Sequence, residues 1–129
     1  MKILIVDDKT SIRKEMKKIL TQLEFDDVTE AIDGNDAWFK LKAEFEGRPA
    51  EKFDLIISDM EMPKMSGLEL LEAVRKDKIL KDMPFIMVTT VNTKDVILKT
   101  MKLGIQAYII KPFNLKSVAA KLVQAGILK

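Results

Sequence analysis

The sequence predicts an α/β fold in which a parallel sheet lies between two layers of helices. Short apolar runs alternate five times with segments whose apolar residues recur at helical spacing. Most of these runs are apolar at every position, which indicates strands that are buried on both faces. The chain has 129 residues, of which 47% are hydrophobic, enough for one domain with a substantial core. Such alternation favours right-handed crossovers between parallel strands.

The predicted strands cover residues 3–6, 28–31, 55–57, 85–88 and 108–110. The second strand interleaves polar and apolar residues, which favours a position at an edge of the sheet. Pro63 and Gly67 follow the third strand and delay the next helix, so we expect a loop of several residues after Asp59.

Five helices are predicted from apolar stripes, each after one strand. The stripes are Ile12, Met16, Ile19, Leu20 and Leu23; Ala37, Trp38, Leu41 and Phe45; Leu68, Leu71 and Val74; Val96, Ile97, Met101 and Leu103; and Leu115, Val118, Leu122 and Val123. The expected caps are Thr10 or Ser11 for the first helix, Asp33 or Asn35 for the second, Asn114 for the last, and Gly104 at the end of the fourth. The polar segment 46–52 is too short to separate domains, so we expect a single domain over residues 1–129 with no output domain.

Composition excludes several classes of protein. The net charge is +2 and no basic block dominates, which argues against nucleic acid or a membrane surface as the main partner. The chain has no Cys and no His, so thiol catalysis, disulfides, His-based triads and His-ligated zinc are excluded. The first apolar run ends after four residues at Asp7, too short for a signal peptide, and no run reaches transmembrane length. We therefore expect a cytoplasmic monomer.

Residues capable of chemistry follow four of the five predicted strands. They are Asp7 and Asp8, Asp59, Thr89 and Thr90, and Lys111. Functional groups collect at the carboxyl ends of strands in such sheets, so we expect these side chains to meet at one edge.

Three carboxylates at that edge would repel one another. At separations near 5 Å, each pair would cost about 3 kcal/mol at an effective dielectric constant near 20, which Lys111 alone cannot offset. A divalent cation can, and carboxylate oxygens favour Mg²⁺. The alternative is a solvated acidic edge with raised pKa values and no metal.

Together with Lys111 and the Thr89 hydroxyl group, the three carboxylates and a metal ion suit phosphoryl transfer. Asp59, isolated on its strand and expected to be exposed, is the best nucleophile, and adjacent Asp7 and Asp8 suit a shared metal.

These motifs resemble the receiver domain of two-component response regulators, over essentially the whole chain. The matching segments are residues 3–8 (ILIVDD), 30–34 (EAIDG), 59–63 (DMEMP) with Gly67, 87–89 (MVT) and 109–113 (IIKPF). Within that family the chain is most similar to the single-domain, CheY-like chemotaxis regulators. The resemblance implies a flavodoxin-like doubly wound (βα)5 sheet with strand order 2-1-3-4-5.

The resemblance also implies a role for each site residue. Asp59 is the implied phosphoacceptor, and Mg²⁺ is held by Asp7, Asp8, Asp59 and the backbone carbonyl group of Glu61. Thr89 and Lys111 contact the phosphoryl group. Thr89 and Tyr108 act as the switch, although the ring of Tyr108 could simply pack against the last strand. The family usually has a cis peptide bond before the proline that matches Pro112.

The sequence departs from the family pattern near this edge. Thr90 stands where Ala or Gly is preferred, Glu61 where Asn or another residue is common, and Val91 where a polar residue is common. Such positions influence phosphoryl lifetime in the family. The polar insertion at 47–51 is expected to lie far from the edge and to be neutral.

The implied partners are a histidine kinase as phosphodonor and an output protein. The output surface would be formed by the fourth helix, fifth strand and fifth helix, with Lys94, Lys99, Lys102 and Lys116 near apolar residues. A flagellar motor switch component is the expected partner, and a phosphorelay through a His phosphotransfer protein is the alternative. We expect no enzymatic turnover. Two other functions are alternatives. One is a Mg²⁺-dependent aspartyl-nucleophile phosphatase with Glu61 as general acid/base. The other is a flavin-binding protein, but Asp7 and Asp8 would repel the phosphate group of the flavin.

Overall fold

The computed structural model describes residues 1–43, 52–90 and 94–129 and contains a five-stranded parallel sheet. The strands are β1 (Ile3–Val6), β2 (Val28–Ala31), β3 (Leu55–Asp59), β4 (Phe85–Thr89) and β5 (Ala107–Ile110). The helices are α1 (Thr10–Gln22), α2 (Gly34–Leu41), α3 (Gly67–Lys76), α4 (Lys94–Leu103) and α5 (Leu115–Gln124). The strand order is β2-β1-β3-β4-β5, so the predicted fold class and order are confirmed, with β2 at an edge.

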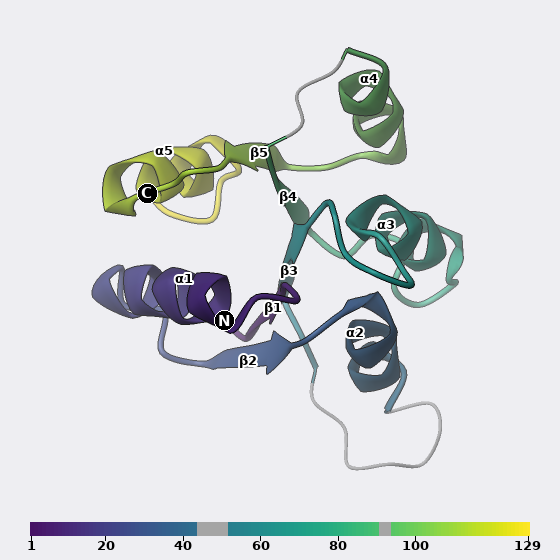
Figure 1. Cartoon of the computed structure of the whole chain (residues 1–129), viewed down its shortest axis with the longest axis horizontal. Coiled ribbons are helices and arrows are strands. Elements are labelled where there is room, and N and C mark those ends of the chain that lie inside the picture. Colours follow the sequence, from purple (N-terminus) through teal and green to yellow (C-terminus); the bar gives the residue numbers. More distant parts are fainter. Residues whose placement is uncertain (44–51, 91–93) are drawn as a thin grey trace.

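Helices cover both faces of the sheet. Figure 1 shows α1 and α5 on one side and α2, α3 and α4 on the other. Neighbouring residues of a strand therefore enter different cores: Ile3 and Ile5 pack on the α1–α5 side, whereas Leu4 and Val6 pack on the other. This two-sided burial explains why the central strands are apolar at consecutive positions.

The register of the strands brings their carboxyl ends together at one edge. Val6 of β1 pairs with Ser58 of β3, and Asp59 pairs with Val88 of β4. The N–H group of Lys111 then donates to the carbonyl oxygen of Thr89 at 3.0 Å. The residues that follow β1, end β3 and β4, and follow β5 are consequently neighbours, as predicted.

Most of the predicted helix ends are confirmed. The side chain of Asp33 caps α2 by accepting from the Asp36 N–H group, and Asn114 forms a capping box with Ser117 at α5. Gly104 follows α4 with a φ angle of +83°, a backbone conformation that suits glycine.

The predicted cap of α1 by Thr10 or Ser11 is wrong. The helix begins at Thr10, and its N-cap is Lys9, whose side chain makes no capping hydrogen bond. The Thr10 hydroxyl group is used elsewhere, because it accepts from Nη2 of Arg13 at 3.2 Å. The Lys9 N–H group instead donates a hydrogen bond to the Asp7 carboxylate at 2.8 Å.

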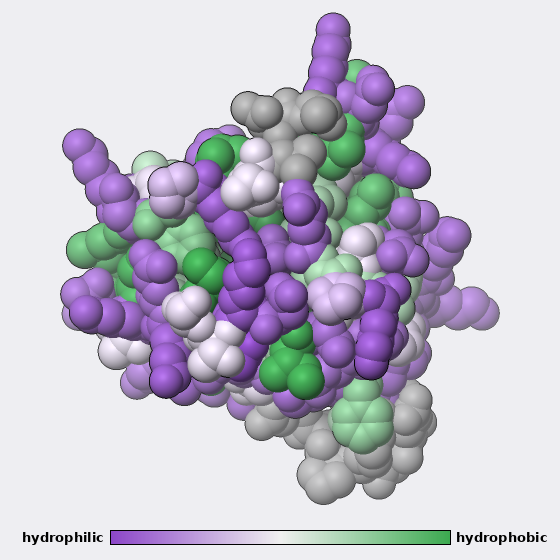
Figure 2. All heavy atoms as spheres, viewed as in Figure 1, coloured by the Kyte–Doolittle hydropathy of each residue, from purple (hydrophilic) through white to green (hydrophobic). Residues whose placement is uncertain are grey.

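Some stripe residues do not lie in the core. Met101, Leu115 and Val123 were expected to be buried, yet they are exposed on α4 and α5. Phe45, Val91 and the polar insertion fall outside the described residues. The face in Figure 2 is mainly hydrophilic, with hydrophobic side chains in separate small groups. Among the described residues, no helix has both the length and the apolar composition needed to cross a bilayer.

Candidate functional site

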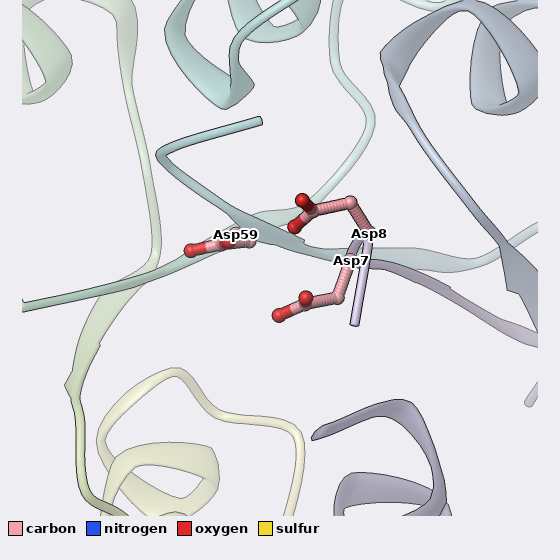
Figure 3. A group of neighbouring side chains, drawn as sticks. All are labelled: Asp7, Asp8 and Asp59. Atoms are coloured by element: carbon pink, nitrogen blue, oxygen red, sulfur yellow. The ribbon is translucent and has the colours of Figure 1, made fainter. Parts of the chain in front are cut away.

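Three carboxylates meet at the carboxyl edge of the sheet, and we call Asp7, Asp8 and Asp59 the acid cluster. One oxygen of each lies within 4.8 Å of the others, close to the expected separation. Figure 3 shows Asp7 and Asp8 leaving the end of β1 and Asp59 coming from neighbouring β3. Asp8 is exposed, so the cluster opens to solvent there.

Asp59 is not exposed as the sequence led us to expect. Strand β3 continues two residues beyond the predicted end at Ile57, and Asp59 is its last residue. Only 4% of Asp59 is accessible to solvent, and 5% of Asp7. Both acids therefore carry a large desolvation cost when ionised.

The ammonium group of Lys111 lies between these two buried acids. Its Nζ is 3.1 Å from an oxygen of Asp59 and 3.3 Å from one of Asp7. Burial and the charge of Asp7 hold the pKa of Asp59 above its ordinary value, against the lowering effect of Lys111. Burial works to lower the pKa of Lys111, but the two carboxylates outweigh it and raise that pKa. One cation is thus stabilised by two anions, and the anions remain under-neutralised.

Backbone groups fix the directions of the acids. The Lys9 N–H group holds one oxygen of Asp7, and the backbone N–H group of Glu61 donates to the Asp59 carboxylate. The side chain of Glu61 is exposed. Gly67 closes the loop after β3: a Cβ atom there would lie 2.1 Å from the carbonyl oxygen of Asp59. The loop can pack under Asp59 only because this residue has no side chain.

The two threonines at the end of β4 have different surroundings. Thr89 is buried, whereas Thr90 is exposed and lines a cavity of about 210 Å³ beside Lys111. Glu15, Ile12, Pro112 and Phe113 complete that cavity. Thr90 therefore borders the approach to Lys111, as its place in the sequence suggested.

Tyr108 lies against α4. Its ring is half-buried against the core on the α2–α4 side, and burial raises the pKa of its hydroxyl group. The hydroxyl group donates a long hydrogen bond, 3.5 Å, to the carbonyl oxygen of Val96. The Lys111–Pro112 peptide bond is cis, as the resemblance implied.

Sequence analysis missed one residue of the site, Arg13. It lines a small cavity, about 10 Å³, together with Asp7 and Asp59. A signal was available: Arg13 stands beside Ile12 on the side of α1 that faces the sheet, where a charged residue needs a partner.

Known proteins are similar to this chain in sequence and in fold. Residues 3–123 match the family described as response regulator receiver domain. A chemotaxis protein CheY homolog of Campylobacter jejuni is 42% identical over 122 residues, which cover 95% of this chain and 89% of the relative. Chemotaxis response regulator CheY4 of Vibrio cholerae has a structure with a TM-score of 0.82 and 32% identity, covering 96% of this chain and 97% of that one.

A second similar structure is the Mn²⁺-bound form of response regulator Rcp1. Its TM-score is 0.76 at 27% identity, with 97% of this chain and 89% of that chain covered. The family match extends over nearly the whole chain and includes Asp7, Asp8 and Asp59 of the acid cluster. This protein, a CheY-like signalling protein, therefore belongs to the response regulator receiver domain family.

Proposed function

We propose that Asp59 accepts a phosphoryl group from a histidine kinase and that the phosphorylated protein signals by binding an output partner in chemotaxis. The observation that carries the proposal is the under-neutralised acid cluster with Lys111 between Asp7 and Asp59. An anionic phosphoryl group cannot approach three carboxylates unless a further cation is present.

In the proposed step, an oxygen of Asp59 attacks phosphorus. A P–O bond forms while the P–N bond to the kinase imidazole breaks, and the departing imidazole takes up a proton from solvent. Lys111 and Thr89 would each contact one phosphoryl oxygen. The Glu61 N–H group, which already donates to Asp59, keeps the attacking carboxylate in place.

The acid cluster fits a hard divalent cation, because its donors are all carboxylate oxygens. We propose Mg²⁺, held by Asp7, Asp8, Asp59 and the backbone carbonyl group of Glu61. When bound, it would neutralise the acids and draw electron density from the phosphoryl oxygens. The similar response regulator Rcp1 has a Mn²⁺-bound form, which supports a divalent cation in this protein.

Labelling with radioactive acetyl phosphate tests the nucleophile. We expect wild-type protein to be labelled only with Mg²⁺ present, and Asp59→Asn to take no label. Asp8→Ala should lose Mg²⁺ binding and keep its fold. Labelling of Asp59→Asn at the wild-type level would show that another residue is the nucleophile.

The chemistry acts on the protein itself, so we propose no enzymatic turnover. Glu61 stands two residues after Asp59, the spacing of an aspartyl phosphatase acid, and its side chain is exposed on the loop. Incubation with a panel of phosphate esters separates the two functions, because repeated turnover would favour the phosphatase.

The proposed output surface is the face formed by α4, β5 and α5. It exposes Leu98, Met101, Ile110 and Leu115. Around them lie four exposed lysines, at positions 94, 99, 102 and 116. An apolar centre among cations suits an amphipathic acidic segment, and a flagellar motor switch component is the proposed partner. The relative's name places it in chemotaxis, which supports a partner in that system.

Binding measurements separate this partner from a phosphorelay. We expect a motor-switch peptide to bind more tightly when BeF₃⁻ and Mg²⁺ mimic phosphorylation, and a ten-fold gain corresponds to about 1.4 kcal/mol. An unchanged affinity, together with rapid transfer to a His phosphotransfer protein, would instead favour the relay.

We further propose that the protein works as a cytoplasmic monomer and as one receiver domain without an output domain. The Campylobacter relative is matched over 89% of its own length, which supports a stand-alone receiver. Kinase and regulator must share a compartment, and the kinase needs ATP. Nucleic acid and membrane are not proposed as partners, because the net charge is only +2.

A further inference from the structure

Arg13 is a charged side chain beside the acid cluster for which the proposed phosphorylation chemistry gives no role. We propose that it is a positioning residue: it fixes the peptide unit that joins Asp7 to Asp8 and thereby sets the Mg²⁺ affinity of the acid cluster. The inference rests on the proposed function, because it assigns a role toward the proposed metal.

The guanidinium group makes three hydrogen bonds to three parts of the fold. Nη1 donates to the carbonyl oxygen of Asp7 at 2.8 Å, and Nη2 donates to the Thr10 hydroxyl group at 3.2 Å. Nε donates to the Glu30 carboxylate at 3.0 Å. The side chain is only 11% exposed. Arg13 therefore ties the end of β1 to both α1 and β2.

The Glu30 residue, whose carboxylate accepts from Nε of Arg13, is itself held in place. It lies within β2 and pairs in register with Ile5 of β1, so its backbone is held by the sheet. A planar guanidinium group whose Nε is fixed by a carboxylate has both terminal nitrogens fixed as well. Arg13 can then hold the Asp7 carbonyl group in one direction.

The Asp7 carbonyl group belongs to the same planar unit as the N–H group and Cα atom of Asp8. Holding that carbonyl group thus also orients the start of the Asp8 side chain. The Asp7 carboxylate has restraints of its own, from the Lys9 N–H group and from Lys111. Asp8 is exposed, so the restraint on this peptide unit matters most for Asp8.

A simple electrostatic role would have the opposite effect on metal binding. Arg13 borders the same small cavity as Asp7 and Asp59 and carries a positive charge. If it acted only as a nearby cation, removing it would reduce repulsion toward Mg²⁺ and tighten binding. If it positions Asp7 and Asp8, removing it must weaken binding, and residues that orient metal ligands commonly contribute about 10-fold or more to affinity.

Isothermal titration of the full chain with Mg²⁺, without any phosphodonor, distinguishes the two roles. We expect Arg13→Ala to weaken Mg²⁺ binding about 10-fold and Arg13→Lys to recover little, because an ammonium group cannot reproduce the planar fork. Lys17→Ala is the matched control. It removes the same charge from the same helix, and Lys17 is half exposed and 3.9 Å from Glu30. Its affinity should stay within two-fold of wild type.

Two variants of Glu30 test the same idea without altering Arg13. Glu30→Gln keeps an oxygen that accepts from Nε, so we expect near-wild-type Mg²⁺ affinity. Glu30→Ala removes the carboxylate that accepts from Nε of Arg13, so it should weaken Mg²⁺ binding several-fold. This pair decides the question if Arg13→Ala does not fold.

A second readout separates metal positioning from chemistry. The Mg²⁺ concentration that gives half-maximal phosphorylation by acetyl phosphate should rise about 10-fold in Arg13→Ala, because the affinity for the metal is what the substitution alters. Equal or tighter Mg²⁺ binding by Arg13→Ala, or equal binding by the two Glu30 variants, would overturn the proposal. If wild-type protein bound Mg²⁺ but Asp59→Asn were still phosphorylated, the proposed function would fail while the role of Arg13 stood.

Discussion

Asp7 and Asp59 are both nearly enclosed, and they share the single ammonium group of Lys111. For Asp59 the cost of burial, together with the charge of Asp7, exceeds the gain from Lys111, so its pKa is raised. When no cation is bound, the ionised form of Asp59 is therefore energetically unfavourable, and Asp59 is where the proposed chemistry begins. A bound cation would relieve that cost, which couples metal binding to stability.

The first prediction concerns pH. A carboxyl group whose folded-state pKa lies above its unfolded value stabilises the fold fully at low pH, and this contribution is lost as the pH rises through the folded pKa. Asp59→Asn removes the charge. In EDTA, the variant should therefore be more stable than wild type at pH 7, and its advantage should shrink toward pH 4.

Urea unfolding in EDTA at several pH values measures this difference. Adding Mg²⁺ at pH 7 should reduce the advantage of Asp59→Asn, because only the wild type has the complete acid cluster. An advantage that does not change with pH would mean that Asp59 carries no such cost.

The second prediction concerns Glu61. Its N–H group contacts Asp59, and its side chain is exposed to solvent. Because Glu61 is only two residues from Asp59, its carboxylate could act on a water molecule that attacks the phosphoryl group. We expect Glu61→Asn to change the dephosphorylation rate several-fold without abolishing the reaction. The decay of labelled protein after donor removal measures it, and an unaltered decay would leave Glu61 as an ordinary loop acid.

At the scale of elements, the β3–α3 loop positions the phosphoacceptor candidate. Gly67 begins α3, and its N–H group donates to the carbonyl oxygen of Met60 at 2.9 Å. Ser66 and Glu69 form a capping box around the same turn. The helix start and the end of β3 are therefore packed backbone to backbone, with no space for a side chain.

The third prediction follows from that contact. In Gly67→Ala the new methyl group would meet the Asp59 carbonyl oxygen, so the loop must move; we expect a loss of about 2 kcal/mol in stability and slower phosphorylation. Gly126→Ala is the control, because no atom lies within 4 Å of its Cβ position although φ is +76°. It should cost about 1 kcal/mol and leave phosphorylation unchanged. Equal phosphorylation rates in the two variants would contradict this account.

The elements were predictable because burial on both faces leaves a strong pattern. Strand β1, apolar at four consecutive positions, is an example. The closeness of Asp7, Asp8 and Asp59 was predictable from topology alone. Hydrogen bonds made by side chains were not: the Thr10 hydroxyl group, an expected cap of α1, instead accepts from Nη2 of Arg13. The burial of Asp59 was missed because two polar residues end β3, and polarity is a poor guide to where a central strand stops.

At the scale of the whole molecule, α4 is the helix that is least anchored in the core. Thr100 is its one buried residue, whereas α3 buries Gly67, Leu70, Leu71 and Val74. Its carboxyl end is nevertheless held, because the guanidinium group of Arg75 on α3 donates to the carbonyl oxygens of Leu103 and Gly104. Toward its amino end, Val96 accepts the long hydrogen bond from Tyr108. A helix tied at one end and weakly held at the other is suited to conformational change.

The last prediction is that phosphorylation acts mainly on the amino-terminal half of α4 and on β5. Thr89 ends β4 and pairs with Ile110 of β5, and its carbonyl oxygen accepts from the Lys111 N–H group. A displacement of Thr89 toward a phosphoryl group would therefore be passed directly to β5. From β5, Tyr108 contacts Val96. Hydrogen–deuterium exchange with and without BeF₃⁻ and Mg²⁺ should thus change most between residues 94 and 110, and least in β2 and α2, which lie at the opposite edge of the sheet (Figure 1).

Arg75→Met provides the matching variant. Without the guanidinium group, the carboxyl end of α4 should also exchange faster, and the response to BeF₃⁻ should extend along the whole helix. Asp77, two residues further along the chain, forms an ion pair with Lys42 at the end of α2, so α3 itself should remain folded. A response spread evenly over α1, α2 and α4 would mean that the signal passes through both cores, because each core lies on a different face of the sheet.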